Sequence, residues 1–353
     1  MKVAILTFHN EDNYGALLQA YSLQQTLLKM GVNSQFIEIE PKHPDEVNKE
    51  EKTTNGPMNF FANKLQIENS KRGVLFEAFR EAHLHRSKSY TSEELEKLSD
   101  NYECFIVGSD QVWNFYSPVV DYRYVLPFVP KEKSYSYAAS FGTDRVPDKL
   151  RGQLSEAFQN FQMISVREES GREIIRDLTG REAVVCLDPS LLMSAADFEK
   201  IEEGQEIDAQ YVLLFILSYD EVLVEKAKKY AIEHGLQLKT ITACFMPQFG
   251  FEAWNQTGEE QWIYLIHHAQ AVFTNSFHGT VLSLMFGKIF MVAGLKGALE
   301  KRNGRIYELL KMVDAEGSLE EPISIGVEVF QEKIQQRKKI SMNYLKKVQD
   351  CHE

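Results

Sequence analysis

Short apolar runs alternate with amphipathic stretches along most of this chain, and that alternation limits the folds that it can adopt. Residues 3–8 form a continuous apolar run of strand length. Residues 15–31 then carry apolar side chains at helical spacing and end at Gly31, as a helix with a glycine cap does. A second strand-like run, 33–40, follows at once. Because two parallel strands need a crossover of this kind, the pattern predicts an α/β fold with a parallel sheet.

Residues 41–102 interrupt this alternation. The first part, 41–57, is polar and contains three prolines and a glycine, which predicts a loop. Residues 73–83 and 91–100 have the character of helices, and the second helix begins with a Thr-x-x-Glu capping box. We therefore expect a helical insertion or flap at about 41–102.

The alternation resumes after this region, and an acidic stretch without a strand pattern, 194–208, divides the chain into two such runs. With 353 residues the chain exceeds what one hydrophobic core usually serves. We predict two Rossmann-like, doubly wound domains, 1–193 and 205–325, and a charged helix, 326–353, that packs back onto the first. Ligands of such sheets bind beyond the carboxyl ends of the strands, so two facing domains should line one cleft with their strand-end loops.

Composition narrows the choice of partners. The formal net charge of −12 argues against nucleic acid, because phosphate backbones attract basic surfaces. None of the four cysteines belongs to a C-x-x-C pair, which favours buried free thiols in a reducing compartment. No apolar run approaches membrane-spanning length, and the apolar run in MKVAILTFHN is too short for a signal peptide. We therefore expect a cytoplasmic protein.

Two loops of the first predicted domain carry polar residues directly after a strand. In HNEDNYG, Asn13 either caps the next helix or holds a polar ligand together with backbone N–H groups, and Gly15 permits close packing. This loop has a single glycine, so it is neither a dinucleotide fingerprint nor a P-loop. In VGSDQVWN, Asp110 either caps a helix or accepts a proton from a sugar hydroxyl. Trp113 either packs in the core or stacks on a sugar ring, and its strand-end loop favours stacking.

An arginine, Arg167, follows the strand predicted at 163–166. A salt bridge to Glu168 or Glu169 is the commoner role for such a residue. A guanidinium at a cleft loop also suits a carboxylate or phosphate, which it binds through two parallel hydrogen bonds.

A histidine, His278, stands in the strand-to-helix turn TNSFHG. Of the nine histidines, only His9 and His278 lie at predicted strand ends that face the cleft. The positive end of a helix disfavours imidazolium and a bound phosphate favours it, so His278 is poised to exchange a proton with a phosphorylated substrate. The adjacent His267 and His268 are expected on different faces of a helix, so no metal site is predicted.

Seven stretches together resemble, in order and spacing, the polysaccharide pyruvyl transferase family, from residue 3 to about residue 313. They are NYGALLQAYSLQQTL, FIVGSDQVWN, YAASFG, ISVREES, LDPSLLM, TNSFHGTVLSLMFGK and NGRIYELL. The resemblance implies a GT-B-like fold and transfer of pyruvate from phosphoenolpyruvate to a sugar of a bacterial surface glycan or exopolysaccharide. The product it implies is a cyclic ketal, or in some members an enolpyruvyl ether, with phosphate released and no cofactor besides the co-substrate.

The resemblance also implies roles for individual residues. Arg167 matches the family's arginine, His278 matches its histidine, and Lys296 stands where a basic residue usually follows the next strand. As a hypothesis, Arg167 and Lys296 bind phosphoenolpyruvate and His278 protonates its methylene carbon. Asp110 or Asp12 then takes the proton of the sugar hydroxyl. The other residues expected to bind substrate are small or polar and lie in the same loops: Asn13, Gly15, Ser109, Asn114, Ser140, Ser276 and Gly279.

The expected acceptor is a lipid-linked or nucleotide-linked sugar, and peripheral contact with membrane-bound glycan machinery is compatible with it. Two alternatives stay open. A GT-B glycosyltransferase that uses a nucleotide-sugar would favour a carboxylate for ribose near 294–300, which Glu300 could supply. A non-catalytic family member would have a degenerate site, and the retention of Arg167 and His278 argues against one.

Overall fold

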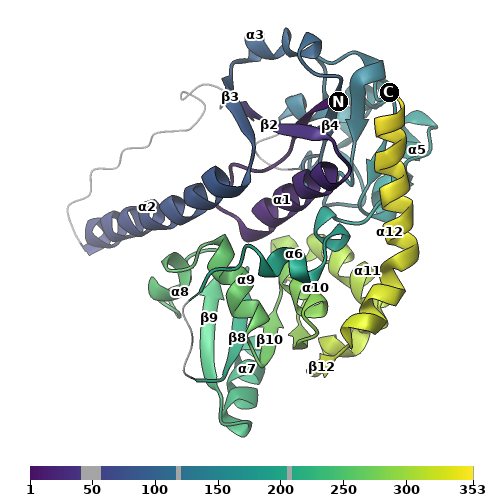
Figure 1. Ribbon diagram of the computed structural model, residues 1–353. Coiled ribbons are helices and arrows are strands. Elements are labelled where there is room, and N and C mark those ends of the chain that lie inside the picture. Colours follow the sequence, from purple (N-terminus) through teal and green to yellow (C-terminus); the bar gives the residue numbers. More distant parts are fainter. Residues whose placement is uncertain (41–56, 117–120, 205–208, 353) are drawn as a thin grey trace.

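The computed structural model describes residues 1–40, 57–116, 121–204 and 209–352. Two five-stranded sheets lie in separate halves of the molecule (Figure 1). The strands of the first sheet, in spatial order, are β3 (Arg86–Tyr90), β2 (Asn33–Ile39), β1 (Lys2–Leu6), β4 (Cys104–Val107) and β5 (Ser134–Ser136). Those of the second are β12 (Ile323–Ser324), β11 (Ile289–Val292), β10 (Ala271–Thr274), β8 (Tyr211–Ile216) and β9 (Gln237–Thr242).

All neighbouring strands in these sheets run parallel, except that the short edge strand β12 is antiparallel to β11. A further parallel pair, β6 (Ser165–Val166) and β7 (Val184–Val185), adjoins the first sheet through a bridge between Ala139 and Val166. The predicted α/β fold with two doubly wound sheets is confirmed.

Helices make the crossovers between these strands. In chain order they are α1 (Tyr14–Lys29), α2 (Pro57–His83), α3 (Ser92–Leu95), α4 (Arg151–Gln159), α5 (Glu169–Thr179), α6 (Ala195–Glu199), α7 (Glu221–Glu233), α8 (Glu252–Asn255), α9 (Glu259–His267), α10 (Phe277–Met285), α11 (Gly304–Met312) and α12 (Val327–Asp350). The short helices between them include the 3-10 helices η6 (Pro189–Leu192) and η7 (Gly297–Asn303).

Helix α1 lies where the two halves meet (Figure 1). Asn13 caps it by accepting from the N–H groups of Gly15 and Ala16, at 3.0 and 3.2 Å. Its first residue, Tyr14, donates to the carbonyl of Thr257 at 2.8 Å and meets the ring of Phe215 edge-on. One apolar core therefore continues from the first sheet into the second.

The region predicted as a helical insertion contributes a strand as well. Its residues 86–90, RSKSY, form β3 and pair with β2 at the edge of the first sheet. β3 lies at the edge of the sheet, so only one side of it is paired, and its residues are charged or polar. Such a strand has no apolar run that would reveal it in the sequence. The capping box at Thr91 and Glu94 forms as predicted. The predicted loop 41–57 lies outside the described residues, apart from its last position.

Helix α2 of this region reaches the second half. The guanidinium of Arg72 donates to the carbonyls of Thr242 and Trp254 there, and to the carbonyl of Asp12 in the first loop. Arg80, two turns further along, pairs with the Asp12 carboxylate at 2.9 Å. The first loop is thus held from outside by α2.

Helix α12 leaves the second half after β12 and runs along the first (Figure 1). Tyr344 donates to the carbonyl of Ser136 at 2.8 Å, and Ser341 accepts from the N–H of Leu187 at 2.9 Å. Both partners belong to the first half, so α12 ties the two halves together along one side.

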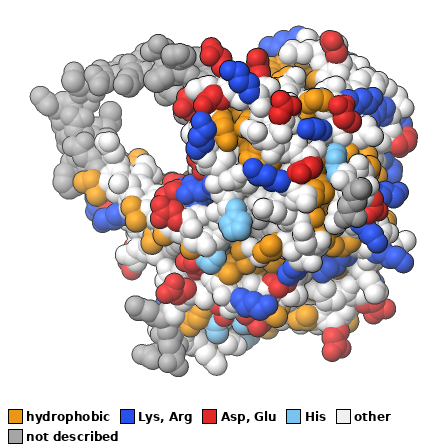
Figure 2. All heavy atoms as spheres, turned by 45° about the horizontal axis from the view of Figure 1, so that its top comes forward, with side chains coloured by type: hydrophobic (Ala, Val, Ile, Leu, Met, Phe, Trp, Pro, Cys, Tyr) orange, Lys and Arg blue, Asp and Glu red, His pale blue; other side chains and the backbone are white. Residues whose placement is uncertain are grey.

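The surface agrees with the composition. On the face seen in Figure 2, basic and acidic side chains are interspersed. Among the helices described, none combines the length and apolar character that crossing a bilayer requires. The prediction of buried thiols holds for Cys104 and Cys186 but is wrong for Cys244 and Cys351, which are exposed because they lie in a loop and near the chain end.

Candidate functional site

A fully buried carboxylate, Asp188, lies where loops of both halves meet. It precedes η6, and its Oδ1 accepts from the backbone N–H and the hydroxyl of Ser190 at 3.0 and 2.7 Å. Its Oδ2 accepts from Nη1 of Arg167 at 2.9 Å. The Nε2 atom of His278, from the second half, lies 3.5 Å from Oδ1. Asp188 thus connects Arg167 and His278, the two residues that the sequence singled out. The sequence did not single out Asp188 itself.

The charges around Asp188 compensate for its burial. Burial by itself would raise the pKa of this carboxyl, but His278, Arg167 and Ser190 hold it well below its usual range. For Arg167, burial would lower the pKa, but the carboxylates of Glu168, Asp188 and Asp110 raise it above the ordinary arginine value. An ionised pair inside the protein is stable only with such partners, so the cluster holds a charged arginine in place.

A second arginine, Arg305, approaches Arg167 from α11. Nη1 of Arg305 and Nη2 of Arg167 lie 3.7 and 3.8 Å from the same Oδ1 of Asp110, too far for direct hydrogen bonds. Both guanidinium groups lie 5.6 Å from the centre of the Phe277 ring. Burial and the neighbouring Arg167 lower the pKa of Arg305 to about 10. Two guanidinium groups that approach the same carboxylate oxygen are close enough to bind one anion together.

Both arginines still have N–H groups to offer. Nη2 of Arg167 and Nε of Arg305 are buried and have no hydrogen-bond partner within the described part of the chain. Asp110 follows β4, and its backbone φ of 62° turns the chain sharply there. Its carboxylate lies near both guanidinium groups.

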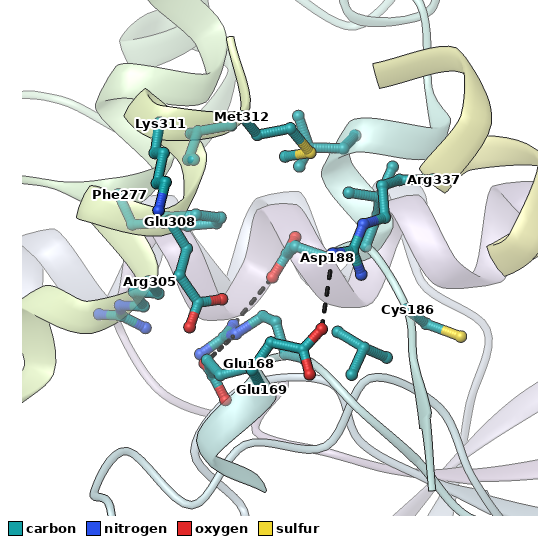
Figure 3. Close-up of a pocket in the computed structure, with 15 residues that line it drawn as sticks. Glu168, Glu169, Cys186, Asp188, Phe277, Arg305, Glu308, Lys311, Met312 and Arg337 are labelled. Carbon is teal, nitrogen blue, oxygen red and sulfur yellow. Dashed lines mark hydrogen bonds and ion pairs between the residues drawn. The ribbon is translucent and has the colours of Figure 1, made fainter. Parts of the chain in front are cut away.

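Arg167, Asp188, Phe277 and Arg305 line a cavity of about 450 Å³ between the first half and α11 and α12. Asp110 and His278 contact these residues but are not part of the cavity lining. Figure 3 shows Arg305, Glu308 and Phe277 on one side of it and Asp188, Glu169 and Arg337 on the other. The cavity has the size of a small-molecule site, and charged groups converge on it.

Glu308, in the cavity wall, has an unusual carboxyl group. Partial burial and the neighbouring Glu168 and Glu169 raise its pKa to about 7. A carboxyl that titrates near neutral pH can give or take a proton under working conditions. Sequence reasoning missed this residue, because its neighbours in space lie in α5 and at the end of β6.

The raised pKa of Glu308 predicts a pH dependence of stability. Between about pH 4.5 and 7 the unfolded chain has lost this proton and the folded protein has kept it, so the free energy of unfolding should fall as the pH rises. Glu308→Gln should remove this part of the slope, matching the wild type at pH 4.5 and exceeding it at pH 8. Thermal melts across this range measure it. Glu225→Gln, at a surface position, is the control, and parallel profiles of wild type and Glu308→Gln would contradict the assignment.

His278 is held by close contact with the first loop. An added Cβ at Gly15 would stand 2.2 Å from its Nδ1 atom, so only glycine fits at that position. Ser276 caps α10 by accepting from the N–H of Gly279, where a Cβ would meet Thr274 and Phe215. Gly15, Ser276 and Gly279 therefore position the histidine.

Gly15→Ala should displace the imidazole and destabilise the protein by about 1–3 kcal/mol, the usual cost of overpacking. Urea denaturation followed by fluorescence measures the change. Gly152→Ala is the matched control, since a Cβ there meets nothing within 4 Å, and it should leave stability equal or slightly higher. Equal stabilities of the two variants would show that the first loop does not hold the histidine.

The structure does not bring every predicted residue to the cavity. Lys296 has a 66% exposed side chain and pairs with Asp220 at 2.6 Å, beyond the carboxyl ends of β11 and β8 and outside the cavity lining. Asn114 bonds locally to Gln111 and Tyr116. The second basic residue beside Arg167 is Arg305 instead. It belongs to the stretch NGRIYELL, but the family resemblance implied no role for it.

The serines of the first half stand behind the charged cluster. Ser140 donates to Glu168, which in turn accepts from Nε of Arg167 at 2.9 Å. Ser109 donates to the carbonyl of Ala138, and its hydroxyl lies 3.4 Å from Asp188. Both are buried, so they support the cluster from below rather than line the cavity.

Three interpretations of aromatic and imidazole side chains prove wrong. Trp113, expected to stack on a sugar, is fully buried and packs edge-on against Phe158. His9 does not face a cleft: it stacks on Phe36, and burial lowers its pKa to about 4. His267 and His268 do not point apart, because His268 caps the end of α9 and both rings turn to one carboxylate.

Comparison with known proteins agrees with this arrangement. The model of the family described as polysaccharide pyruvyl transferase matches residues 13–293. Among solved structures, a UDP-GlcNAc 2-epimerase from Methanocaldococcus jannaschii has a TM-score of 0.51 at 13% identity, covering 97% of this chain and 93% of its own. A putative UDP-N-acetylglucosamine 2-epimerase from Listeria monocytogenes has a TM-score of 0.52 at 10% identity, covering 98% and 94%.

At such low identities the two epimerases show the fold alone, which is the two-domain arrangement of GT-B-like enzymes. No curated protein matches the chain. The family model spans most of the chain and covers Asp110, Arg167 and His278. The chain therefore belongs to the polysaccharide pyruvyl transferase family.

Proposed function

We propose that the protein transfers pyruvate from phosphoenolpyruvate to a sugar of a bacterial surface glycan or exopolysaccharide, forming a ketal and releasing phosphate. The observation that carries the proposal is the pair of arginines, Arg167 and Arg305, whose Nη2 and Nε atoms are buried and unpartnered among the described residues. A buried N–H without a partner is costly, and an anion that accepts from both would remove the cost.

Phosphoenolpyruvate suits this pair because it carries two anionic groups. Each guanidinium can bind a carboxylate or a phosphate through parallel hydrogen bonds. In the proposal Arg305 replaces Lys296 as the second cation that binds phosphoenolpyruvate. Arg305 lies beside Arg167 over Phe277, whereas Lys296 does not line the cavity. Lys311 and Arg337 also lie in the cavity wall, and Arg337 is 3.5 Å from the Glu169 carboxylate there.

The chemistry begins with a proton. His278 gives it to the methylene carbon, which becomes a methyl group and leaves an oxocarbenium-like centre at C2. One sugar hydroxyl attacks C2 and loses its proton. A second hydroxyl then forms the other C–O bond as the C2–O bond to phosphate breaks, and phosphate leaves with the remaining proton. Asp188 contacts both His278 and Arg167, so the proton donor and the anion-binding cation share one support.

The acceptor of the hydroxyl proton is assigned to Glu308. Its pKa of about 7 matches a group that takes a proton near neutral pH. Asp110, the first candidate for this step, lies between two guanidinium groups and serves here to position them. Asp12, the second candidate, is bound by Arg80 of α2.

The proposed acceptor is a lipid-linked or nucleotide-linked sugar, which places the reaction in the cytoplasm, beside membrane-bound glycan machinery. The test uses thermal shifts with phosphoenolpyruvate and with UDP-sugars, because a true ligand stabilises the folded protein by mass action. Phosphate release is then measured with phosphoenolpyruvate and a panel of glycosyl acceptors. A shift with UDP-sugars alone, and no phosphate release, would favour a nucleotide-sugar glycosyltransferase. No shift with either ligand would favour a non-catalytic protein.

Arg305→Met tests the carrying observation directly. It removes the second guanidinium from the cavity and should raise the KM for phosphoenolpyruvate more than it lowers kcat, since the contact exists before the reaction begins. Lys296→Met is the matched control, because that lysine pairs with Asp220 instead. If Lys296→Met raised KM as much as Arg305→Met, the assignment of the binding cation would be wrong.

A further inference from the structure

A second cluster of ligand-type side chains lies outside the cavity, at the end of α9. Glu202 belongs to the segment that leads from the first half towards β8, and His267 and His268 end α9. Nδ1 of His267 lies 2.9 and 3.1 Å from the two carboxylate oxygens, and Nε2 of His268 lies 3.4 Å from one of them. One ligand atom from each residue falls within 4.8 Å of the others.

These separations are close to those of a metal site. Zinc binds imidazole nitrogen and carboxylate oxygen at about 2.0–2.2 Å, so two ligand atoms of a tetrahedral site stand about 3.4 Å apart. The shortest distance from Glu202 to the His267 ring, 2.9 Å, is below this value, and that to the His268 ring, 3.4 Å, matches it. The Glu202 carboxylate therefore stands near the separation that a shared ion requires from each ring, and the three ligand atoms all lie within 4.8 Å of one another.

The rings are already fixed in the orientation that a metal needs. His267 stacks on Phe286 with ring centres 4.3 Å apart, and His268 lies against Tyr264 at 4.1 Å with the two rings tilted by 31°. Ligands whose orientation is set beforehand lose little freedom when they bind an ion.

The backbone next to Glu202 is also held. The N–H of Glu203 donates to the carbonyl of Glu260 in α9 at 3.3 Å. At Gly204 an added Cβ would stand 2.2 Å from the ring of Tyr264, so the chain there lies directly against this aromatic residue. These contacts of the main chain with α9 hold the Glu202 carboxylate beside the two imidazoles.

The surroundings allow an ion to enter. The side chains of His267 and His268 are 27% and 44% exposed, whereas Glu202 is 14% exposed, so one side of the cluster is open to solvent. Lys288 interacts electrostatically with Glu202 but is not part of the cluster. Two imidazoles and one carboxylate, with an open fourth position, form a donor set that zinc prefers.

We propose that Glu202, His267 and His268 bind a divalent transition-metal ion of the zinc class and thereby fasten the segment before β8 to α9. The site lies on the outside of the second half and has no residue in common with the cavity. A bound ion would tie the connection between the two halves to α9, and its fourth position would be left to a water molecule or another small ligand. The proposal does not depend on the proposed reaction.

Isothermal titration of the full chain, without an affinity tag, with Zn²⁺ or Co²⁺ tests the site, together with the visible absorption of bound Co²⁺. We expect one ion per chain and a Tm that rises with metal concentration. Glu202→Gln and His267→Ala should each weaken binding at least ten- to a hundredfold, since even the loss of an outer-shell partner costs that much.

His234→Ala is the matched control. His234 also caps the end of a helix and stacks on a tyrosine, Tyr230, at 4.0 Å, but its Nδ1 bonds to the carbonyl of that tyrosine. A Cys244→Ser/Cys351→Ser variant removes the exposed thiols, and it should keep the site. Failure to bind either ion, or the same affinity in Glu202→Gln and His267→Ala as in wild type, would overturn the proposal.

Discussion

Asp188→Ala should destabilise the folded protein by about 3–5 kcal/mol, the usual result of removing one partner of a buried ion pair. The Asp188 side chain is 0% exposed and that of Arg167 is 3% exposed, so the buried arginine would keep only Glu168 at hydrogen-bond distance. His278 and Ser190 would lose the same partner. Urea denaturation measures the effect as a lower midpoint at an unchanged slope.

Two comparisons separate this effect from ordinary truncation. Asp177→Ala removes a surface carboxylate that pairs with Arg151 and should cost about 0–1 kcal/mol. The double variant Asp188→Leu/Arg167→Met removes both charges, and it should be more stable than Asp188→Ala. If Asp188→Ala cost no more than Asp177→Ala, the central place of this carboxylate in the site would be disproved.

His278→Gln should lower kcat for phosphate release from phosphoenolpyruvate by about 10²- to 10⁴-fold, the usual contribution of a general acid. The amide cannot protonate carbon, but the arginines that bind the anion remain. The KM for phosphoenolpyruvate, and its thermal shift, should therefore change little. Steady-state phosphate release, with melts in the presence and absence of phosphoenolpyruvate, provides both readouts.

The thermal shift with phosphoenolpyruvate distinguishes the loss of the proton donor from the loss of the whole site. If His278→Gln lost both turnover and the shift with phosphoenolpyruvate, the histidine would be needed to form the site and not specifically for the proton. His234→Ala, on the exposed end of α7, should keep full activity. A kcat within tenfold of wild type in His278→Gln would remove this residue from the proton step.

Much of the fold could be predicted because its signals are local. Periodic apolar residues and a terminal glycine located α1, and a single charged amphipathic run located α12. β3 escaped detection because an edge strand with alternating charge has no local apolar signal. The extent of α2 was also missed, since its stability comes from contacts of residues such as Arg72 with the second half.

The candidate site was predictable only in part. Arg167 stands directly after β6 and His278 lies in the first turn of the helix that follows β10. Both positions are where α/β sheets gather their ligands, so position in the chain was informative. Asp188 stands before a proline in a short 3-10 helix, where an aspartate is common as a cap. Its role depends on which side chains surround it, and no local pattern contains that information.

The sequence by itself determined the alternation of strands and helices, the edge of each sheet at which functional loops gather, and the family. Hydrophobic periodicity and motif spacing act over a few residues, so they can be read along the chain. Only the tertiary structure decided the partners: Arg305 rather than Lys296 beside Arg167, a core position for Trp113, and one carboxylate between His267 and His268. Charge pairing and burial depend on distances between segments far apart in sequence, and those distances exist only once the two halves have packed together.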